Sequence, residues 1–333
     1  MRIAVLLGVA GLLGCGMAGA DFTDREDIRA YMAELVKEHG FNQQELEEVI
    51  SSARHRQDVL DLMSKPAEKR LEWWEYRRIF LRETTIDQGL EFWAANEAIL
   101  DQATVRFGVP PEYVVAIIGV ETRWGRVVGR HRVLDALMTL AFDDSHRRPT
   151  FFRDELTEFL LLAREEGKNP LDLKGSYAGA MGYGQFMPSS YRNYAVDFDG
   201  DGLRDIWKNE SDAIGSVANY FQRHGWKGSG PVVVQVDVAS DRLRAVDAVA
   251  NKGVNLGHTV SELQALGVEV GELPGDAKAA MFRMGLEQGE EYWLGLNNFY
   301  VIMRYNRNRL YALAVHQLGQ AIKERRLAST ALR

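Results

Sequence analysis

A glutamate closes one of the most apolar segments of the chain. The stretch VVAIIGVETRWG, residues 114–125, is apolar up to Val120 and then carries Glu121. Pro111 and Glu112 favour a helix start, because proline suits the first turn and a carboxylate suits its positive end. The pattern predicts a buried helix that presents Glu121 in its last turn.

This position would disfavour the ionised form of Glu121. Desolvation, apolar neighbours and the negative end of the helix raise a carboxyl pKa, from about 4.3 toward roughly 6. A carboxyl that is still protonated near neutral pH is a general acid, which glycosidic cleavage needs to protonate the leaving oxygen. The alternative is an ion pair of Glu121 with Arg123 or Arg126, or a side chain that points to solvent.

Neutral polar and aromatic side chains gather in a glycine-rich stretch. GSYAGAMGYGQFMPSSY, residues 175–191, offers Ser176, Gln185 and several tyrosine rings with little charge. Sugars are bound by such neutral hydrogen bonds and ring faces. The alternative is a structural loop that leads into a helix beginning near Pro188.

An acidic loop follows this stretch. Asp197, Asp199 and Asp201 alternate before Gly202, which matches the opening D-x-D-x-D-G of a calcium loop of EF-hand type. Leu203 would add its backbone carbonyl at the seventh position. The alternative is an acidic turn that is merely solvated.

The end of this loop departs from the EF-hand pattern. The twelfth position, where a bidentate glutamate is expected, is Lys208. A later carboxylate, Glu210 or Asp212, would therefore have to close the site.

Regions of different periodicity must position these residues. Helical spacing dominates residues 24–230 and returns from Asn298. Between them, Pro231–Val238 alternates as a strand does. The stretch Thr259–Leu266 suggests a short helix capped by Thr259 or Ser261. We expect an α+β fold that is mainly α. Its predicted parts are a helical N-terminal domain at 21–96, a core at 97–230 plus 296–328, and a small β-containing insertion at 231–295.

Composition bounds the class of protein. The 333 residues are 46% hydrophobic and 26% charged, as in a globular protein of about two domains. The net charge of −7 argues against a nucleic-acid partner. We expect no organic cofactor.

The first twenty residues predict export. Arg2 precedes an apolar run from Ile3 to Leu13 that is too short to span a bilayer. Cleavage after Ala20 would release a soluble chain. The alternative is a lipobox that ends at Cys15, the sole cysteine, whose lipid would be the only membrane anchor and would place the protein at the outer membrane.

Several long motifs, taken in order, closely resemble the lytic murein transglycosylase B family of peptidoglycan-cleaving enzymes. The resemblance runs from about Arg29 to Ala321. The motifs are GVETRWGRVVG, LDLKGSYAGAMGYGQFMPSSY, AVDFDGDG, DAIGSVANYF and NNFYVIMRYN. The resemblance implies a lysozyme-like core, a periplasmic location, glycan strands as the binding partner and possible contacts with other cell-wall enzymes.

The resemblance also assigns roles to residues of this chain. Glu121 matches the sole catalytic acid and base, and Asp212 matches the closing ligand of a structural calcium ion. Phe151 stands where a tyrosine is common, which would cost one hydroxyl contact. The residues that match substrate-binding positions are Tyr76, Arg147, Arg148, Phe151, Ser176, Gln185, Phe186, Tyr220, Tyr305 and Asn306.

The implied reaction is non-hydrolytic cleavage of the β-1,4 bond between N-acetylmuramic acid and N-acetylglucosamine, giving a 1,6-anhydro sugar. One carboxyl suffices because the nucleophile is the sugar's own C6 hydroxyl. A lysozyme-type hydrolase would normally need a second carboxylate, for which Asp135, Asp143 and Asp144 are candidates. A non-catalytic, calcium-dependent wall-binding module is the alternative from another class.

Overall fold

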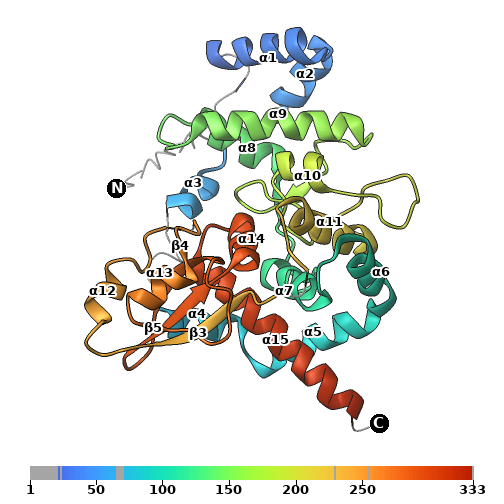
Figure 1. The fold of residues 1–333 in the computed structure, drawn as a ribbon. Coiled ribbons are helices and arrows are strands. Elements are labelled where there is room, and N and C mark those ends of the chain that lie inside the picture. Colours follow the sequence, from blue (N-terminus) through green and yellow to red (C-terminus); the bar gives the residue numbers. More distant parts are fainter. Residues whose placement is uncertain (1–21, 23–24, 65–70, 229, 254, 332–333) are drawn as a thin grey trace, which may run out of the picture.

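The computed structural model describes residues 22, 25–64, 71–228, 230–253 and 255–331 (Figure 1). The predicted signal sequence and Cys15 lie outside the described residues. Helices dominate and one small sheet accompanies them, so the predicted class, α+β and mainly α, is confirmed.

The helices are α1 Glu26–His39, α2 Gln43–Ser51, α3 Gln57–Ser64, α4 Trp73–Phe80, α5 Glu83–Ala95, α6 Glu97–Phe107, α7 Pro111–Thr122, α8 Val133–Phe142, α9 Pro149–Glu165, α10 Pro188–Tyr194, α11 Glu210–Arg223, α12 Leu243–Asp247, α13 Val260–Ala265, α14 Asn297–Tyr305 and α15 Arg309–Ala331. The strands are β1 His131–Arg132, β2 Lys174–Gly175, β3 Val233–Val238, β4 His258–Thr259, β5 Val268–Glu269, β6 Lys278–Gly285 and β7 Glu290–Gly295.

The N-terminal helices pack in two places. Helices α1 and α2 lie over α9 in Figure 1, where Tyr31 bonds Thr157 at 2.9 Å and its ring packs edge-on against Phe142, and α3 packs on α8. Helices α4 and α5 instead pack on α15. The proposed boundary at residue 96 stays a prediction, and α4 and α5 lie with the core.

Helix α7 is the centre of the core, between α5, α6, α11 and α15. Its residues from Glu112 to Gly119 are buried, which explains why the helix is apolar on every side. Helix α15 crosses it closely at Gly319, where a Cβ atom would lie 2.8 Å from the carbonyl oxygen of Glu112. The close approach of α15 matters for the site described below.

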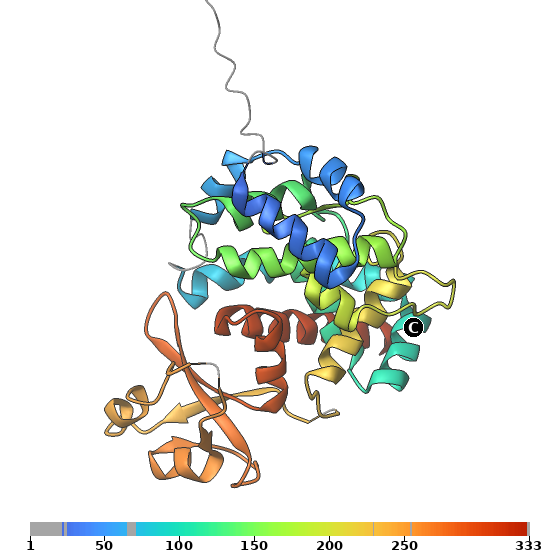
Figure 2. The ribbon, with the colours of Figure 1, turned by 90° about the horizontal axis from the view of Figure 1, so that it is seen from above.

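The sheet belongs to the predicted insertion. Its five strands are antiparallel in the order β4-β6-β7-β3-β5. One face, including Phe282 and Trp293, joins the main core, while Met281 and Tyr292 point to a second small core under α12 and α13. Figure 2 shows this lobe beside the helical part, with α14 following directly from it.

Two local predictions for the insertion are confirmed. The alternating stretch from Pro231 contains β3. The short helix α13 begins after Thr259, whose hydroxyl accepts the N–H of Glu262 while the Glu262 carboxylate accepts the N–H of Thr259. This capping box satisfies donors that the first helical turn leaves unpaired.

Within the described residues, no single helix has the length and apolar character needed to cross a membrane. Helices α6 and α7 pass that test only as a pair, and they are bent by 114° to each other.

Candidate active site

Helix α7 delivers Glu121 as the sequence predicts. The helix starts at Pro111 and ends at Thr122, so Glu121 lies in its last turn, half-buried. The helix stops there because Arg123 and Trp124 take left-handed backbone angles, with φ of 50° and 55°. Such angles are unusual for residues other than glycine and need support from the surroundings.

The indole of Trp124 supplies that support. Its Nε1 donates to the Val115 carbonyl at 2.9 Å, and its ring lies over two glycines. A Cβ atom at Gly119 would lie 2.4 Å from the ring, and one at Gly89 would lie 2.9 Å from it. The two glycines therefore make room for the side chain that holds the turn after Glu121.

The Glu121 carboxyl is held by a residue from the last helix of the chain. The hydroxyl of Tyr311, on α15, donates to Glu121 Oε1 at 2.5 Å. Burial and the neighbouring Glu121 raise the pKa of Tyr311 well above its usual value, so its hydroxyl remains a donor at neutral pH.

We expect Tyr311→Phe to lower kcat roughly tenfold with little change in KM, since this hydrogen bond orients the Glu121 carboxyl and such a bond contributes about 0.5–1.5 kcal/mol. Turnover of soluble glycan measures this. The matched control is Tyr292→Phe, which removes a comparable bond, to Asp247 at 2.8 Å, in the small lobe. Wild-type kcat in Tyr311→Phe would contradict the role of this bond.

Three predicted substrate-binding residues form one aromatic cluster. The ring of Phe186 lies 5.8 Å from Tyr220 and 5.9 Å from Tyr305, and those two tyrosines are 4.7 Å apart. Tyr305 donates to the Gly184 carbonyl at 2.6 Å. Burial, followed by the charge of Glu121, raises the pKa of Tyr305. The bond to Gly184 joins the cluster to the turn whose Tyr183 carbonyl accepts from Thr122, the residue after Glu121.

The glycine-rich stretch folds into turns that present Ser176 and Gln185. The Ser176 hydroxyl accepts the N–H groups of Ala178 and Ala180, while Gln185, with φ of 49°, donates to the carbonyls of Gly182 and Val128. Both side chains are half-buried.

A hydroxyl links these turns to helix α7. Thr122 Oγ1 donates to the Tyr183 carbonyl at 2.9 Å and accepts the N–H of Gly125. The end of α7 and the Ser176–Gln185 turns are thus one connected wall.

The remaining predicted substrate residues lie on other elements. Tyr76, in α4, is 1% exposed. Asn306 follows α14 and is half-buried. Arg147 and Arg148 are exposed just before α9, and the guanidinium of Arg148 stacks 4.0 Å from the Phe151 ring. Arg148 and Phe151 thus contact each other at the start of α9.

The carboxylates considered as a second catalytic group are engaged elsewhere. Asp135 is 2% exposed and accepts the N–H of Arg54. Asp143 bonds His55 at 2.8 Å and also bonds Ser145. Burial raises the pKa of Asp143, but the hydrogen bonds with Ser145 and His55 outweigh this effect and lower it. Asp144 is almost fully exposed and lies 3.8 Å from Arg25. Each contacts the N-terminal helical segment or solvent.

The acidic loop brings three carboxylates together. One oxygen from each of Asp197, Asp199 and Asp212 lies within 4.8 Å of the others. Burial raises the pKa of Asp212, partly offset by N–H bonds from Phe198 and Asp205, and the two neighbouring aspartates raise it further. An all-oxygen group short of positive charge suits a hard cation such as calcium.

One loop aspartate and one alternative ligand lie outside this group. Asp201 accepts the N–H of Leu203, whose backbone carbonyl stays a predicted ligand. Glu210 points away from the loop, because its carboxylate accepts Asn96 Nδ2 at 2.7 Å and the Tyr183 hydroxyl at 3.5 Å. Of the two candidates for closing the loop, Asp212 is the one beside Asp197 and Asp199.

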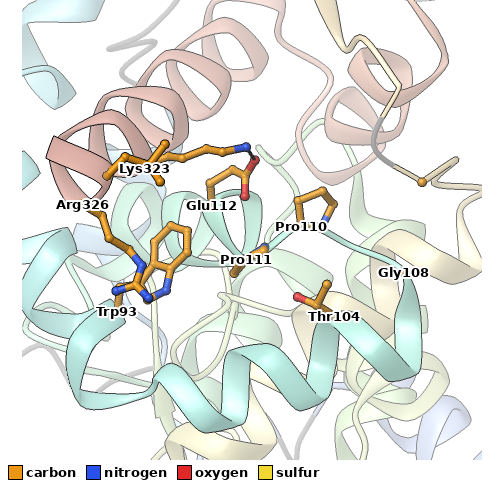
Figure 3. Close-up of a pocket in the computed structure, with 10 residues that line it drawn as sticks. Trp93, Thr104, Gly108, Pro110, Pro111, Glu112, Lys323 and Arg326 are labelled. Carbon is orange, nitrogen blue, oxygen red and sulfur yellow. Dashed lines mark hydrogen bonds and ion pairs between the residues drawn. The ribbon is translucent and has the colours of Figure 1, made fainter. Parts of the chain in front are cut away.

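A pocket of about 400 Å³ lies at the other end of α7 (Figure 3). Trp93, Pro110 and Pro111 line it, and Glu112 Oε1 accepts Lys323 Nζ there at 2.8 Å. Glu112 and Glu121 are separated along the helix by roughly 13 Å, at about 1.5 Å per residue. The pocket is therefore separate from the Glu121 site, and its ion pair ties α15 to α7.

Comparison with known proteins decides the family. Residues 23–320 match the family described as Transglycosylase SLT domain. The chain belongs to this transglycosylase family. It is 44% identical over 314 residues to membrane-bound lytic murein transglycosylase B of Escherichia coli (strain K12), covering 91% of this chain and 84% of that protein.

Solved structures of other transglycosylases are similar throughout. The soluble lytic transglycosylase SltB1 of Pseudomonas aeruginosa superposes with a TM-score of 0.86 at 46% identity, over 90% of this chain and 99% of that one. The Escherichia coli lytic transglycosylase Slt35 in complex with calcium gives 0.83 at 44% identity, over 93% and 96%. These similarities confirm the predicted family and the lysozyme-like fold of this transglycosylase.

Tyr311 is the residue in contact with Glu121 that the sequence patterns missed. Helical spacing assigns it to the buried face of the last helix, together with Leu313, Ala314 and Leu318. The one available signal is that Tyr311 carries a hydroxyl on a face that is otherwise apolar, and a buried hydroxyl needs a partner.

Proposed function

We propose that this protein is a peptidoglycan lytic transglycosylase that uses Glu121 as its only catalytic carboxyl. The observation that carries the proposal is the single carboxyl at the end of a buried helix, held by Tyr311 beside the cluster of Phe186, Tyr220 and Tyr305. The similarity to membrane-bound lytic murein transglycosylase B supports the same substrate, murein glycan strands.

The reaction follows from one carboxyl that changes role. Glu121 protonates the oxygen that leaves C1 of N-acetylmuramic acid, and the N-acetyl group of that sugar stabilises the positive centre. The resulting Glu121 carboxylate then accepts the proton of the C6 hydroxyl as this oxygen attacks C1. The chain is cleaved, a 1,6-anhydro ring forms, and Glu121 is protonated again without any water being consumed.

The other proposed residues bind and orient the glycan. Ser176 and Gln185 offer neutral hydrogen bonds from the wall attached to α7. Tyr76 of α4, Tyr220 of α11, Tyr305 of α14, Phe186 and Asn306 would contact the sugar beside Glu121. Arg147 and Arg148, with Phe151, would meet acidic groups of the substrate farther along. A calcium ion would be held by Asp197, Asp199 and Asp212 with a stabilising role, as the calcium complex of Slt35 suggests.

Location follows from the N-terminal segment and the relative. We propose export to the periplasm, with an outer-membrane anchor if Cys15 is lipidated, in keeping with a relative described as membrane-bound.

Mass spectrometry of the products tests the reaction. Purified peptidoglycan digested with the protein is expected to yield muropeptides that end in 1,6-anhydro-N-acetylmuramic acid, each 18 mass units lighter than the hydrolysis product, roughly one water. Reducing ends in their place would establish a hydrolase of lysozyme type. Binding to peptidoglycan without any cleavage would establish a wall-binding module.

A further inference from the structure

The chain crosses between the helical core and the small lobe twice, and the two crossings meet at Asn298. This residue is 2% exposed and lies in the first turn of α14, just after the return from β7. Its Oδ1 accepts the N–H of Lys227 at 2.8 Å, and its Nδ2 donates to the Lys227 carbonyl at 3.1 Å. The side-chain amide thus pairs with both backbone groups of one residue on the outgoing crossing.

Neighbouring bonds complete this junction. Asn297 Nδ2 donates to the Gly225 carbonyl at 2.8 Å, and the N–H of Leu296 donates to the Val232 carbonyl at 3.0 Å. Because Asn298 is buried, bonds lost there would be poorly replaced by water. The start of α14 is therefore fixed to the core by Asn298.

The other end of α14 forms part of the proposed cleft. The Tyr220 hydroxyl donates to the Arg304 carbonyl at 2.7 Å, and the Tyr305 hydroxyl donates to the Gly184 carbonyl at 2.6 Å. Gly184 allows this contact because a Cβ atom there would lie 2.8 Å from the Tyr305 oxygen. Asn298 and Tyr305 are about 10 Å apart along one short helix, so a shift at one end reaches the other.

We propose that Asn298 is a positioning residue, which fixes α14 and through it sets Tyr305 against Gly184 in the wall of the cleft. The inference rests on the proposed function, which assigns Tyr305 to the sugar site. Misplacing a positioned group by about 1 Å can cost a hundredfold in rate even when the change is remote from the chemistry. A partial release of α14 is expected to lower kcat by a smaller factor, roughly tenfold.

The test is a double-mutant cycle on soluble glycan strands. Asn298→Ala and Tyr305→Phe are each expected to lower kcat, Asn298→Ala by roughly tenfold. If Asn298 acts through Tyr305, the double variant loses no more than the more affected single variant. Asn193→Ala is the matched control, because Asn193 is exposed and bonds only the Ser189 carbonyl of its own helix at 2.8 Å.

Two results would overturn the proposal. One is a folded Asn298→Ala protein with wild-type kcat and only a lower melting temperature. The other is a double variant whose losses multiply. If wild type itself fails to cleave the glycan, the proposed function is wrong, whereas wild-type cleavage with unchanged kcat in Asn298→Ala refutes this inference alone.

Asn298→Asp covers the case in which the alanine variant does not fold. It keeps the acceptor for the Lys227 N–H but loses the donor to the Lys227 carbonyl until its carboxyl is protonated. Its kcat relative to wild type is expected to rise as pH falls. A ratio that stays constant with pH would also overturn the proposal.

Discussion

Glu121→Gln is expected to lower turnover of peptidoglycan by roughly 10²- to 10⁴-fold, the usual contribution of a general acid or base. Glutamine preserves the shape of the side chain and can still accept from Tyr311, so the fold and the aromatic cluster remain. It cannot donate the proton to the leaving oxygen or take one from the C6 hydroxyl. Release of soluble muropeptides from sacculi measures the loss, and KM for soluble glycan is expected to change little.

The matched control for this substitution is Glu324→Gln. Glu324 is a residue of α15, the helix that also carries Tyr311, and it lies two turns or more beyond the cleft end of that helix. Turnover by this variant should equal that of wild type. Solubilisation of sacculi by Glu121→Gln at the wild-type rate would remove Glu121 from the mechanism.

Calcium is expected to raise the melting temperature by several degrees. An ion that binds only the folded state stabilises it by about 2.7 kcal/mol at a concentration one hundred times its Kd. Asp212 is central to this effect, because it is fully buried and its two oxygens also accept the N–H groups of Phe198 and Asp205 at 2.7 Å. Calorimetry with and without calcium measures the shift.

Asp212→Asn should abolish the calcium-dependent shift. The substituted amide keeps one acceptor oxygen in place of two, so the metal-free variant also melts earlier, and only the difference made by calcium is diagnostic. Asp276→Asn, at a position outside the cluster, should keep the full shift. A chelator that removed activity well below the melting temperature, without lowering that temperature, would give calcium a catalytic part instead.

The sequence predicts those features that arise within one continuous segment. The apolar helix that ends in Glu121, the alternating strand β3 and the cap at Thr259 all follow from local periodicity and side-chain chemistry. The acidic loop is equally local, because its aspartates alternate before a glycine. In each case the residues that decide the structure lie within about one or two turns of each other.

The rest depends on segments that are far apart in the chain. Tyr311 is 190 positions away from Glu121, and no sequence pattern in either helix predicts a contact between the two side chains. The left-handed turn at Arg123 could not be predicted from the sequence for the same reason. It depends on the indole of Trp124 lying over Gly119 and Gly89. The packing of α4 and α5 on α15 could not be predicted either, because positions along the chain do not show which distant segments pack together.

The bond between Tyr311 and Glu121 has a consequence for the order of assembly. Glu121 leaves the ribosome long before α15, the last of the described helices, and contacts so distant in sequence form late in folding. The end of α7 that carries Glu121 is synthesised before Tyr311, the residue that orients its carboxyl. A transglycosylase of this fold thereby completes the surroundings of Glu121 only when α15 has docked.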